Sequence, residues 1–114
     1  ISARGRSTSI GFAAQVLAFL EHFGLADDDR AWLLRRQVPH PFGMYRVPLH
    51  FDGERWARVP RTFVDCNAPA YVTIDAMRKR VREQAGWRIV ELPTGHCPMV
   101  SEPQELTRIL LAVA

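Results

Sequence analysis

The sequence predicts an α/β domain with an incomplete sheet. Residues 62–66 and 87–92 have the length and apolar composition of buried strands, and an amphipathic segment at 71–85 lies between them. A strand, a helix and a strand at this spacing form a βαβ unit, so the two strands should be parallel with a right-handed crossover. Parallel sheets are normally covered on both faces and contain several strands. We therefore expect these two strands to form the edge of a larger sheet.

The composition is that of a globular protein. The 114 residues are enough for one domain or part of one, and 47% of them are hydrophobic and 24% charged. These values exclude a disordered, collagenous or coiled-coil chain, and no apolar run approaches the ~18 residues that a membrane span needs. The first residue is Ile rather than Met, so we expect a processed chain, an excised piece or part of a longer reading frame.

The charged residues and cysteines point away from nucleic-acid binding and from disulfides. All of the basic residues except Lys79 are arginines, and they are spread along the chain. A nucleic-acid partner is therefore not expected, and the run Arg78–Arg82 should form a solvated helix face. Cys66 and Cys97 form no CxxC pair, so we expect free thiols in a reducing cytoplasm.

The first half of the chain predicts helices without strands. Residues 8–23 have apolar side chains at helical spacing and end at Gly24. A second helix is predicted over 29–37, after three aspartates that favour a helix N-terminus and before a proline. Residues 38–60 contain four prolines and four aromatic residues and are predicted to be irregular. A loop of this length is commonly a functional loop or a lid.

The second half has recognisable element ends. A turn at Asn67-Ala68-Pro69 follows the first strand, and Gly86 ends the helix at 71–85. Ser101 and Gln104 have the spacing of a capping box, which predicts a final helix over 102–113.

The densest group of chemically active side chains is Thr94-Gly95-His96-Cys97-Pro98-Met99, directly after the second strand. Ligands of open α/β sheets bind at the carboxyl ends of the strands, so His96 is the candidate functional residue. Its neighbours Gly95 and Pro98 are small or rigid, which suits a ring that must be placed accurately. The alternative is a histidine that only hydrogen-bonds a turn.

The C-terminal sequence resembles that of the α/β-hydrolases. The run Gly95-His96-Cys97-Pro98-Met99-Val100-Ser101-Glu102-Pro103-Gln104-Glu105-Leu106, ending in Leu110-Leu111, is most similar to the esterase and hydroxynitrile-lyase-like branch, with its GHxxM-x-x-x-P-x-x-L pattern. Residues 60–66 resemble the seventh strand of that family, and Gly86-Trp87 is typical of the start of its last strand.

Earlier segments resemble the cap region that precedes that strand, namely Ala31-Trp32-Leu33, Pro39-His40-Pro41 and Pro48-Leu49. The resemblance thus implies a partial α/β-hydrolase fold. Residues 1–60 would form a helical cap or lid, and residues 61–114 the C-terminal βαβα part of the core, with the last two parallel strands and their helices.

The same resemblance implies hydrolysis of a small apolar carboxylic ester, with His96 as the base of a Ser, acid and His triad. The chain has no G-x-S-x-G elbow, and Gly5-Arg6-Ser7-Thr8-Ser9 lacks the final glycine. We interpret Ser7 and Ser9 as helix caps. The nucleophile and the oxyanion hole are therefore expected upstream of Ile1, in the N-terminal part of the same fold, and the chain alone should be inactive as a hydrolase.

The triad acid is a second departure from the family pattern. The loop at 67–70, after the first strand, has no carboxylate. Asp65 is the candidate acid within the chain, although strand alternation would turn it into the sheet. Asn67 is an alternative as a neutral acceptor, and some relatives take the acid from after the sixth strand.

Five residues are expected to line an apolar substrate pocket: Trp32, Phe42, Tyr45, Cys97 and Met99. The alternative for the large ones is a cap core. No metal or cofactor is expected, because the cysteines and histidines do not reproduce a zinc spacing. The first alternative function is a non-catalytic module that binds a small ligand. The second is an arginine-driven nucleic-acid binder, for which a steep salt dependence of binding would be the sign and is not expected. The open strand edge and the apolar cap also favour self-association.

Overall fold

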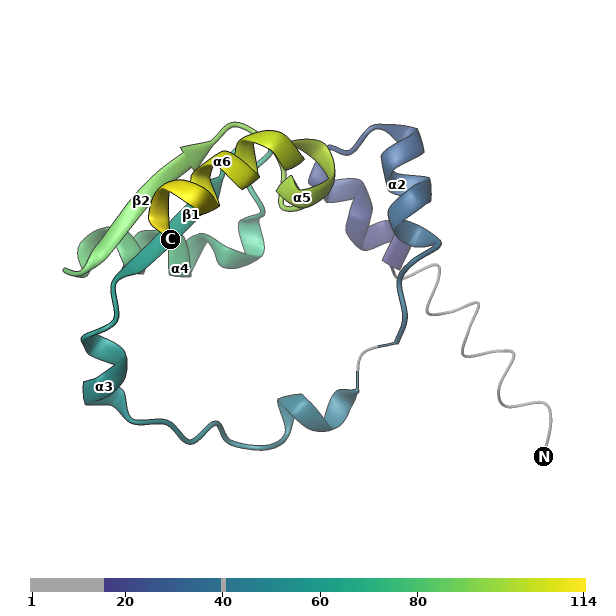
Figure 1. The fold of residues 1–114 in the computed structure, drawn as a ribbon. Coiled ribbons are helices and arrows are strands. Elements are labelled where there is room, and N and C mark those ends of the chain that lie inside the picture. Colours follow the sequence, from purple (N-terminus) through teal and green to yellow (C-terminus); the bar gives the residue numbers. More distant parts are fainter. Residues whose placement is uncertain (1–15, 40) are drawn as a thin grey trace, which may run out of the picture.

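The structure, a computed structural model that describes residues 16–39 and 41–114, contains a two-stranded parallel sheet, which lies on the side away from helix α2 (Asp27–Leu34) (Figure 1). Strand β1 (Arg61–Cys66) pairs along its whole length with β2 (Trp87–Leu92). The two predicted strands and their parallel direction are confirmed. Among the described residues the sheet has no third strand, so both of its outer edges lack a strand partner there.

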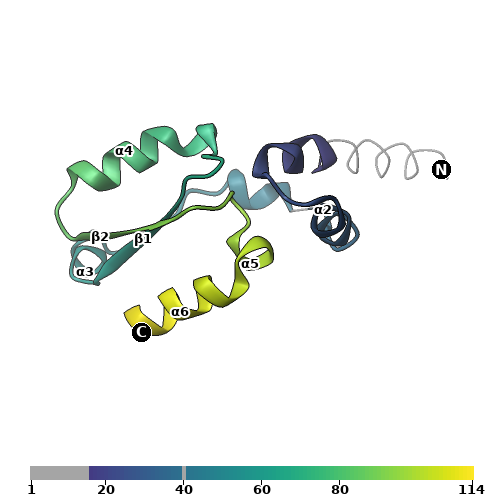
Figure 2. The ribbon, with the colours of Figure 1, turned by 90° about the horizontal axis from the view of Figure 1, so that it is seen from above.

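Helices lie on both sides of this sheet (Figure 2). On one side is α4 (Asp75–Glu83), which follows the 3-10 turn η3 (Val72–Ile74), and on the other side are α5 (Pro98–Ser101) and α6 (Pro103–Val113). Val81 of α4 and Ile109 of α6 are both buried. Each helix thus covers one face of the sheet with an apolar side. None of the described helices has the length and apolar character that crossing a bilayer requires.

The C-terminal helix was predicted within one residue, but its predicted cap is wrong. Helix α6 begins at Pro103 and has no side-chain cap. Ser101 is the last residue of the separate short helix α5, and its hydroxyl bonds to Thr94 and to the Cys97 carbonyl instead. Helix α4 is also shorter than the predicted 71–85. Residues 72–74 form the 3-10 turn η3, and the helix ends at Glu83 rather than at the predicted stop, Gly86.

The N-terminal helices differ from the prediction at their ends. Residues 16–20 are helical and continue into the 3-10 turn η1 (Glu21–Phe23), which ends at Gly24 with a φ of 64°. This end is as predicted, and residues 8–15 lie outside the described part. Helix α2 (Asp27–Leu34) begins earlier than predicted, because the three aspartates form its first turn, where they face the positive end of the helix dipole.

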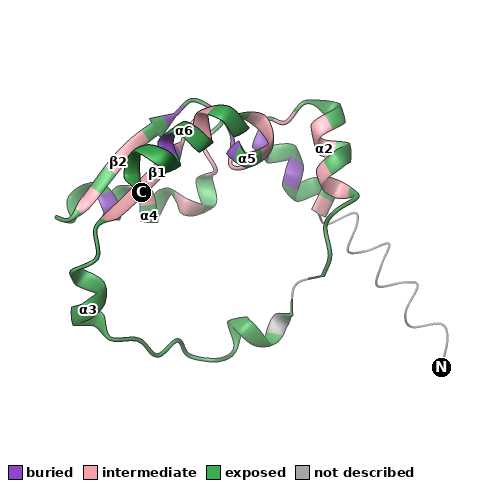
Figure 3. Ribbon diagram, in the orientation of Figure 1, coloured by how far each residue is buried: buried purple, intermediate pink, exposed green. Residues whose placement is uncertain are grey.

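The segment between α2 and β1 loops away from the rest of the chain (Figure 1). It contains the 3-10 turn η2 (Phe42–Tyr45) and the short helix α3 (Gly53–Ala57), which the sequence analysis missed. The Asp52 carboxylate caps α3 by accepting hydrogen bonds from two backbone N–H groups. Every residue from 43 to 60 is exposed (Figure 3), so the apolar side chains of this segment form no packed core of their own.

Candidate active site

Backbone hydrogen bonds join the two loops at the carboxyl end of the sheet. The Asn67 N–H donates to the Leu92 carbonyl at 3.2 Å, and the Ala68 N–H donates to the Thr94 carbonyl at 3.0 Å. The loop after β1 is therefore held directly beside the loop after β2. His96 lies in the second loop, at the sheet edge where ligands of α/β folds bind.

Two hydroxyl groups close the loop that carries His96. The Ser101 hydroxyl donates to the Cys97 carbonyl at 3.2 Å, and it lies 2.6 Å from the Thr94 hydroxyl, which is left as the donor of that bond. Thr94 is buried. The backbone on both sides of His96 is thus fixed to the start of α5.

Gly95 is required because the end of η1 packs against its α-carbon. A Cβ atom at this position would lie 1.8 Å from the carbonyl oxygen of Phe23. The residue that follows this turn, Gly24, packs closely against the other loop: a Cβ there would lie 2.6 Å from Cδ of Pro69. Three segments therefore meet at this point with no room for a side chain at either glycine.

The His96 ring packs against two aromatic rings that the sequence analysis did not select. Its centroid is 4.6 Å from that of Tyr71, at an interplanar angle of 36°, and 5.3 Å from that of Phe23. Within the part of the chain that the structure describes, neither imidazole nitrogen has a hydrogen-bond partner. The sequence could have pointed to Tyr71 by its position. Tyr71 follows the first strand as His96 follows the second, and the carboxyl ends of neighbouring parallel strands meet at one edge of the sheet.

An open cavity of about 500 Å³ lies in front of His96. Three of the predicted pocket residues, Tyr45, Cys97 and Met99, line it together with His96, and its other lining residues are mostly apolar: Val16, Phe19, Leu20, Phe23, Leu33, Gln37 and Val38. This size and lining are typical of sites for small molecules.

The remaining predicted pocket residues are not part of this cavity as described. Trp32 lines a neighbouring cavity of about 460 Å³, which also contains Asp28, Asp29 and Arg35. Met99 lines both cavities and lies between them. The side chain of Phe42 lies outside the described part of the structure.

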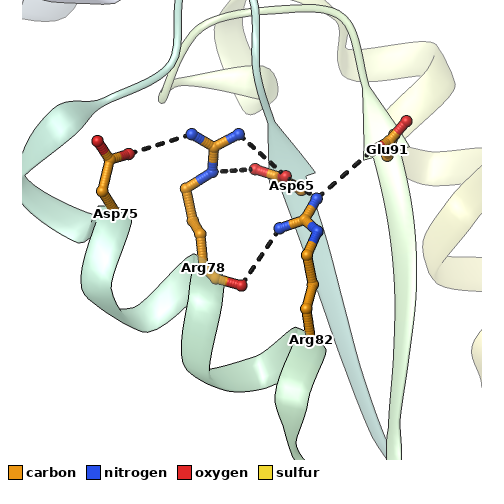
Figure 4. A network of polar contacts seen from close by, with 5 residues as sticks. All are labelled: Asp65, Asp75, Arg78, Arg82 and Glu91. Atoms are coloured by element: carbon orange, nitrogen blue, oxygen red, sulfur yellow. Dashed lines mark hydrogen bonds and ion pairs between the residues drawn. The ribbon is translucent and has the colours of Figure 1, made fainter.

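The structure does not bring the candidate acid, Asp65, to His96. Its carboxylate is 1% exposed and points toward α4 (Figure 4). Arg78 donates to both carboxylate oxygens, at 2.7 Å and 3.1 Å, and Arg82 donates to one of them. The expectation that these arginines only form a solvated face is therefore wrong, because they neutralise a buried charge.

The environment of Asp65 favours its ionised form. Burial alone would raise the pKa of this carboxyl, but the hydrogen bonds from Arg78 and Arg82 outweigh burial and lower the pKa below its ordinary value. Arg78 also pairs with Asp75, and Arg82 with Glu91, so the network joins β1, α4 and β2. Asp65 thus links the helix to the sheet.

The cysteines near the site are suited to packing rather than to nucleophilic attack. Cys66 and Cys97 are free, and burial raises the pKa of both thiols, which keeps them protonated. Across residues 16–39 and 41–114, no group of three or more histidine, cysteine, aspartate or glutamate side chains is arranged to hold a metal ion.

Comparison with known proteins relates the chain to esterases. It is 31% identical over 93 residues to the carbendazim hydrolyzing esterase of Nocardioides sp. (strain SG-4G). The matched residues are 82% of the chain and 38% of that protein. It is 28% identical over 91 residues to methylesterase 7 of Arabidopsis thaliana, or 79% of the chain and 35% of the relative. A second A. thaliana protein with methylesterase in its name is 31% identical over 77 residues, or 67% of the chain and 22% of that protein.

The chain is similar to esterases over most of its length. It spans less than two fifths of the length of each of these relatives. No family model matches the sequence, and no solved structure matches it either. These relatives agree with the resemblance stated above in that their names describe esterases.

Proposed function

We propose that the chain supplies the C-terminal part of an α/β-hydrolase of the esterase and hydroxynitrile-lyase-like branch, which hydrolyses a small apolar carboxylic ester. The observation that carries this proposal is the position of His96, at the carboxyl end of β2 and on the wall of a largely apolar cavity. The similarity to esterases supports it. Residues 1–60 would then be the cap or lid and residues 61–114 the end of the core.

In this mechanism His96 is the general base. Its imidazole takes the proton of a serine hydroxyl as the serine attacks the ester carbonyl, and it returns that proton to the leaving alcohol. It then activates a water molecule that releases the acid. The serine and the oxyanion hole would be supplied by a part of the fold outside residues 1–114. Tyr45, Cys97 and Met99 line the space for the apolar part of the substrate. Trp32 lines the neighbouring cavity and would extend that space past Met99, and the role of Phe42 stays a prediction from the sequence.

The carboxylate that orients His96 is proposed to come from elsewhere than Asp65. To reach the imidazole, Asp65 would have to give up its bonds to Arg78 and Arg82 and leave both arginines without their buried partner. The two alternatives are a carboxylate from after the sixth strand and Asn67 as a neutral acceptor. Asn67 stands in the loop that is hydrogen-bonded beside that of His96.

The proposal is tested by expressing the reading frame that encodes the chain, with any coding sequence before Ile1 included, and by replacing His96 with glutamine in it. Hydrolysis of p-nitrophenyl acetate is expected, and His96→Gln should lower kcat/KM by about 10²–10⁴-fold, because general base catalysis is lost. His50→Gln is the matched control, since His50 is an exposed residue of the 43–60 segment. Absence of turnover, or turnover that His96→Gln leaves unchanged, would contradict the proposal.

A non-catalytic binding module is the second candidate function. The observation in its favour is that both His96 nitrogens lack a hydrogen-bond partner among the described residues, while the apolar cavity is large enough for a small ligand. In that case an apolar ligand such as 1-naphthol would bind equally well to the unsubstituted protein and to His96→Gln, without any ester turnover.

A further inference from the structure

We propose that Tyr71 is a positioning residue for His96 and that, with Phe23, it sets the plane of the imidazole ring. The role of Tyr71 in catalysis rests on the proposed function above, whereas the packing of the His96 ring against Tyr71 and Phe23 does not depend on that function. Neither residue was selected from the sequence, and neither belongs to the serine, acid and histidine triad.

The three rings are in mutual contact. The centroid of His96 is 4.6 Å from that of Tyr71 and 5.3 Å from that of Phe23, and the Phe23 and Tyr71 centroids are 5.3 Å apart at an interplanar angle of 89°. The His96 and Tyr71 planes are the most nearly parallel pair. Two sides of the imidazole are therefore covered by rings, and the ring still borders the open cavity.

The described residues restrict the rotation of the His96 ring by packing against it. The second side-chain torsion of histidine has broad minima, so a ring without a hydrogen bond can rotate unless its neighbours prevent it. Among the described residues, no donor or acceptor holds either nitrogen of His96. A rotation would bring the imidazole edge against the Tyr71 or Phe23 ring.

The two neighbouring rings are themselves fixed. Phe23 is 2% exposed, and Phe19 contacts both it and Tyr71, with centroid distances of 4.6 Å and 5.5 Å. The backbone of Phe23 also touches Gly95, which directly precedes His96. The aromatic cluster and the histidine loop therefore form one packed unit.

Tyr71 is also suited to the protonated state of His96. The imidazole becomes a cation when it takes the serine proton, and the face of an aromatic ring attracts a nearby cation. The interaction needs the ring of Tyr71 and not its hydroxyl group. Phenylalanine at this position should consequently preserve the effect, whereas leucine should remove it.

Nuclear magnetic resonance of the chain tests the packing directly. The Cδ2 and Cε1 protons of His96, assigned with His96→Gln, are expected to be shifted by the ring currents of Tyr71 and Phe23 relative to those of the exposed His22 and His50. The shift should largely disappear in Tyr71→Leu and persist in Tyr71→Phe. Val72→Ala, an adjacent exposed position, is the control and should leave it unchanged.

Ester hydrolysis by the protein that the complete reading frame encodes then tests the positioning role of Tyr71. Tyr71→Leu should lower kcat by on the order of 10- to 10²-fold with little change in KM, and Tyr71→Phe should restore it. His96 signals that coincide with those of His22, or that Tyr71→Leu leaves in place, would overturn the packing. Unchanged kcat in Tyr71→Leu would overturn the positioning role. Ring-current shifts without any ester hydrolysis would overturn the proposed function instead.

Discussion

Replacing Gly95 by alanine is expected to lower the free energy of unfolding by about 3 kcal/mol or more, as a severe case of overpacking. The new Cβ would lie 1.8 Å from the carbonyl oxygen of Phe23. No side-chain rotation can relieve this contact, because the opposing atom belongs to the backbone. The loop of His96 and the end of η1 must separate, and the aromatic cluster loses its packing.

Urea unfolding followed by circular dichroism measures this loss. Gly43→Ala is the matched control, because a Cβ at Gly43 meets nothing within 4 Å. The control should stay within about 0.5 kcal/mol of the unsubstituted chain, as is usual for surface substitutions. An equally small loss for Gly95→Ala would contradict the close packing of η1 against the histidine loop.

The second large effect is expected at Asp65. Removing one partner of a buried ion pair costs about 3–5 kcal/mol, and because both arginines keep some access to water we expect Asp65→Asn to fall near the lower end, about 3 kcal/mol. Asp75→Asn removes an exposed partner of the same Arg78 and should cost less than about 1 kcal/mol. Equal losses in the two variants would show that Asp65 does not link α4 to the sheet.

The stabilisation by Asp65 should depend on pH in a defined direction. Burial alone would raise the pKa of Asp65, but the arginine bonds hold it below its ordinary value in the folded chain. The stabilisation is therefore complete above the unfolded pKa of about 3.9 and is lost as the pH falls through the folded pKa. The difference in unfolding free energy between the unsubstituted chain and Asp65→Asn should be constant from pH 7 to about pH 5 and shrink in more acidic solution.

Local chemistry explains which parts of the fold the sequence predicted. The strands were found from short apolar runs, and Gly24 was found as a helix end because it adopts a positive φ of 64° that favours glycine. Gly86 also has a positive φ, 87°, but it lies in the turn before β2, because α4 already ends at Glu83. The position of His96 followed from the βαβ order alone, since that order decides which end of the sheet the loop occupies.

Non-local contacts explain what the sequence analysis missed. Ser101 has the spacing of a cap, yet its hydroxyl is used by Thr94, seven residues earlier. Arg78 and Arg82 are one helical turn apart, which puts both on one face of α4, but only the packing of that face onto β1 gives them Asp65 as a partner. Tyr71 and Phe23 meet His96 from segments that are distant in sequence.

The central claim, that His96 activates a serine, is tested most directly by the rate at which a fluorophosphonate labels the protein encoded by the complete reading frame. The serine oxygen attacks phosphorus, fluoride leaves, and the histidine takes the serine proton. We predict one adduct by mass spectrometry, on a serine outside residues 1–114, formed about 10²–10⁴-fold more slowly in His96→Gln. No adduct, or an adduct that forms at the same rate in His96→Gln, would contradict the claim.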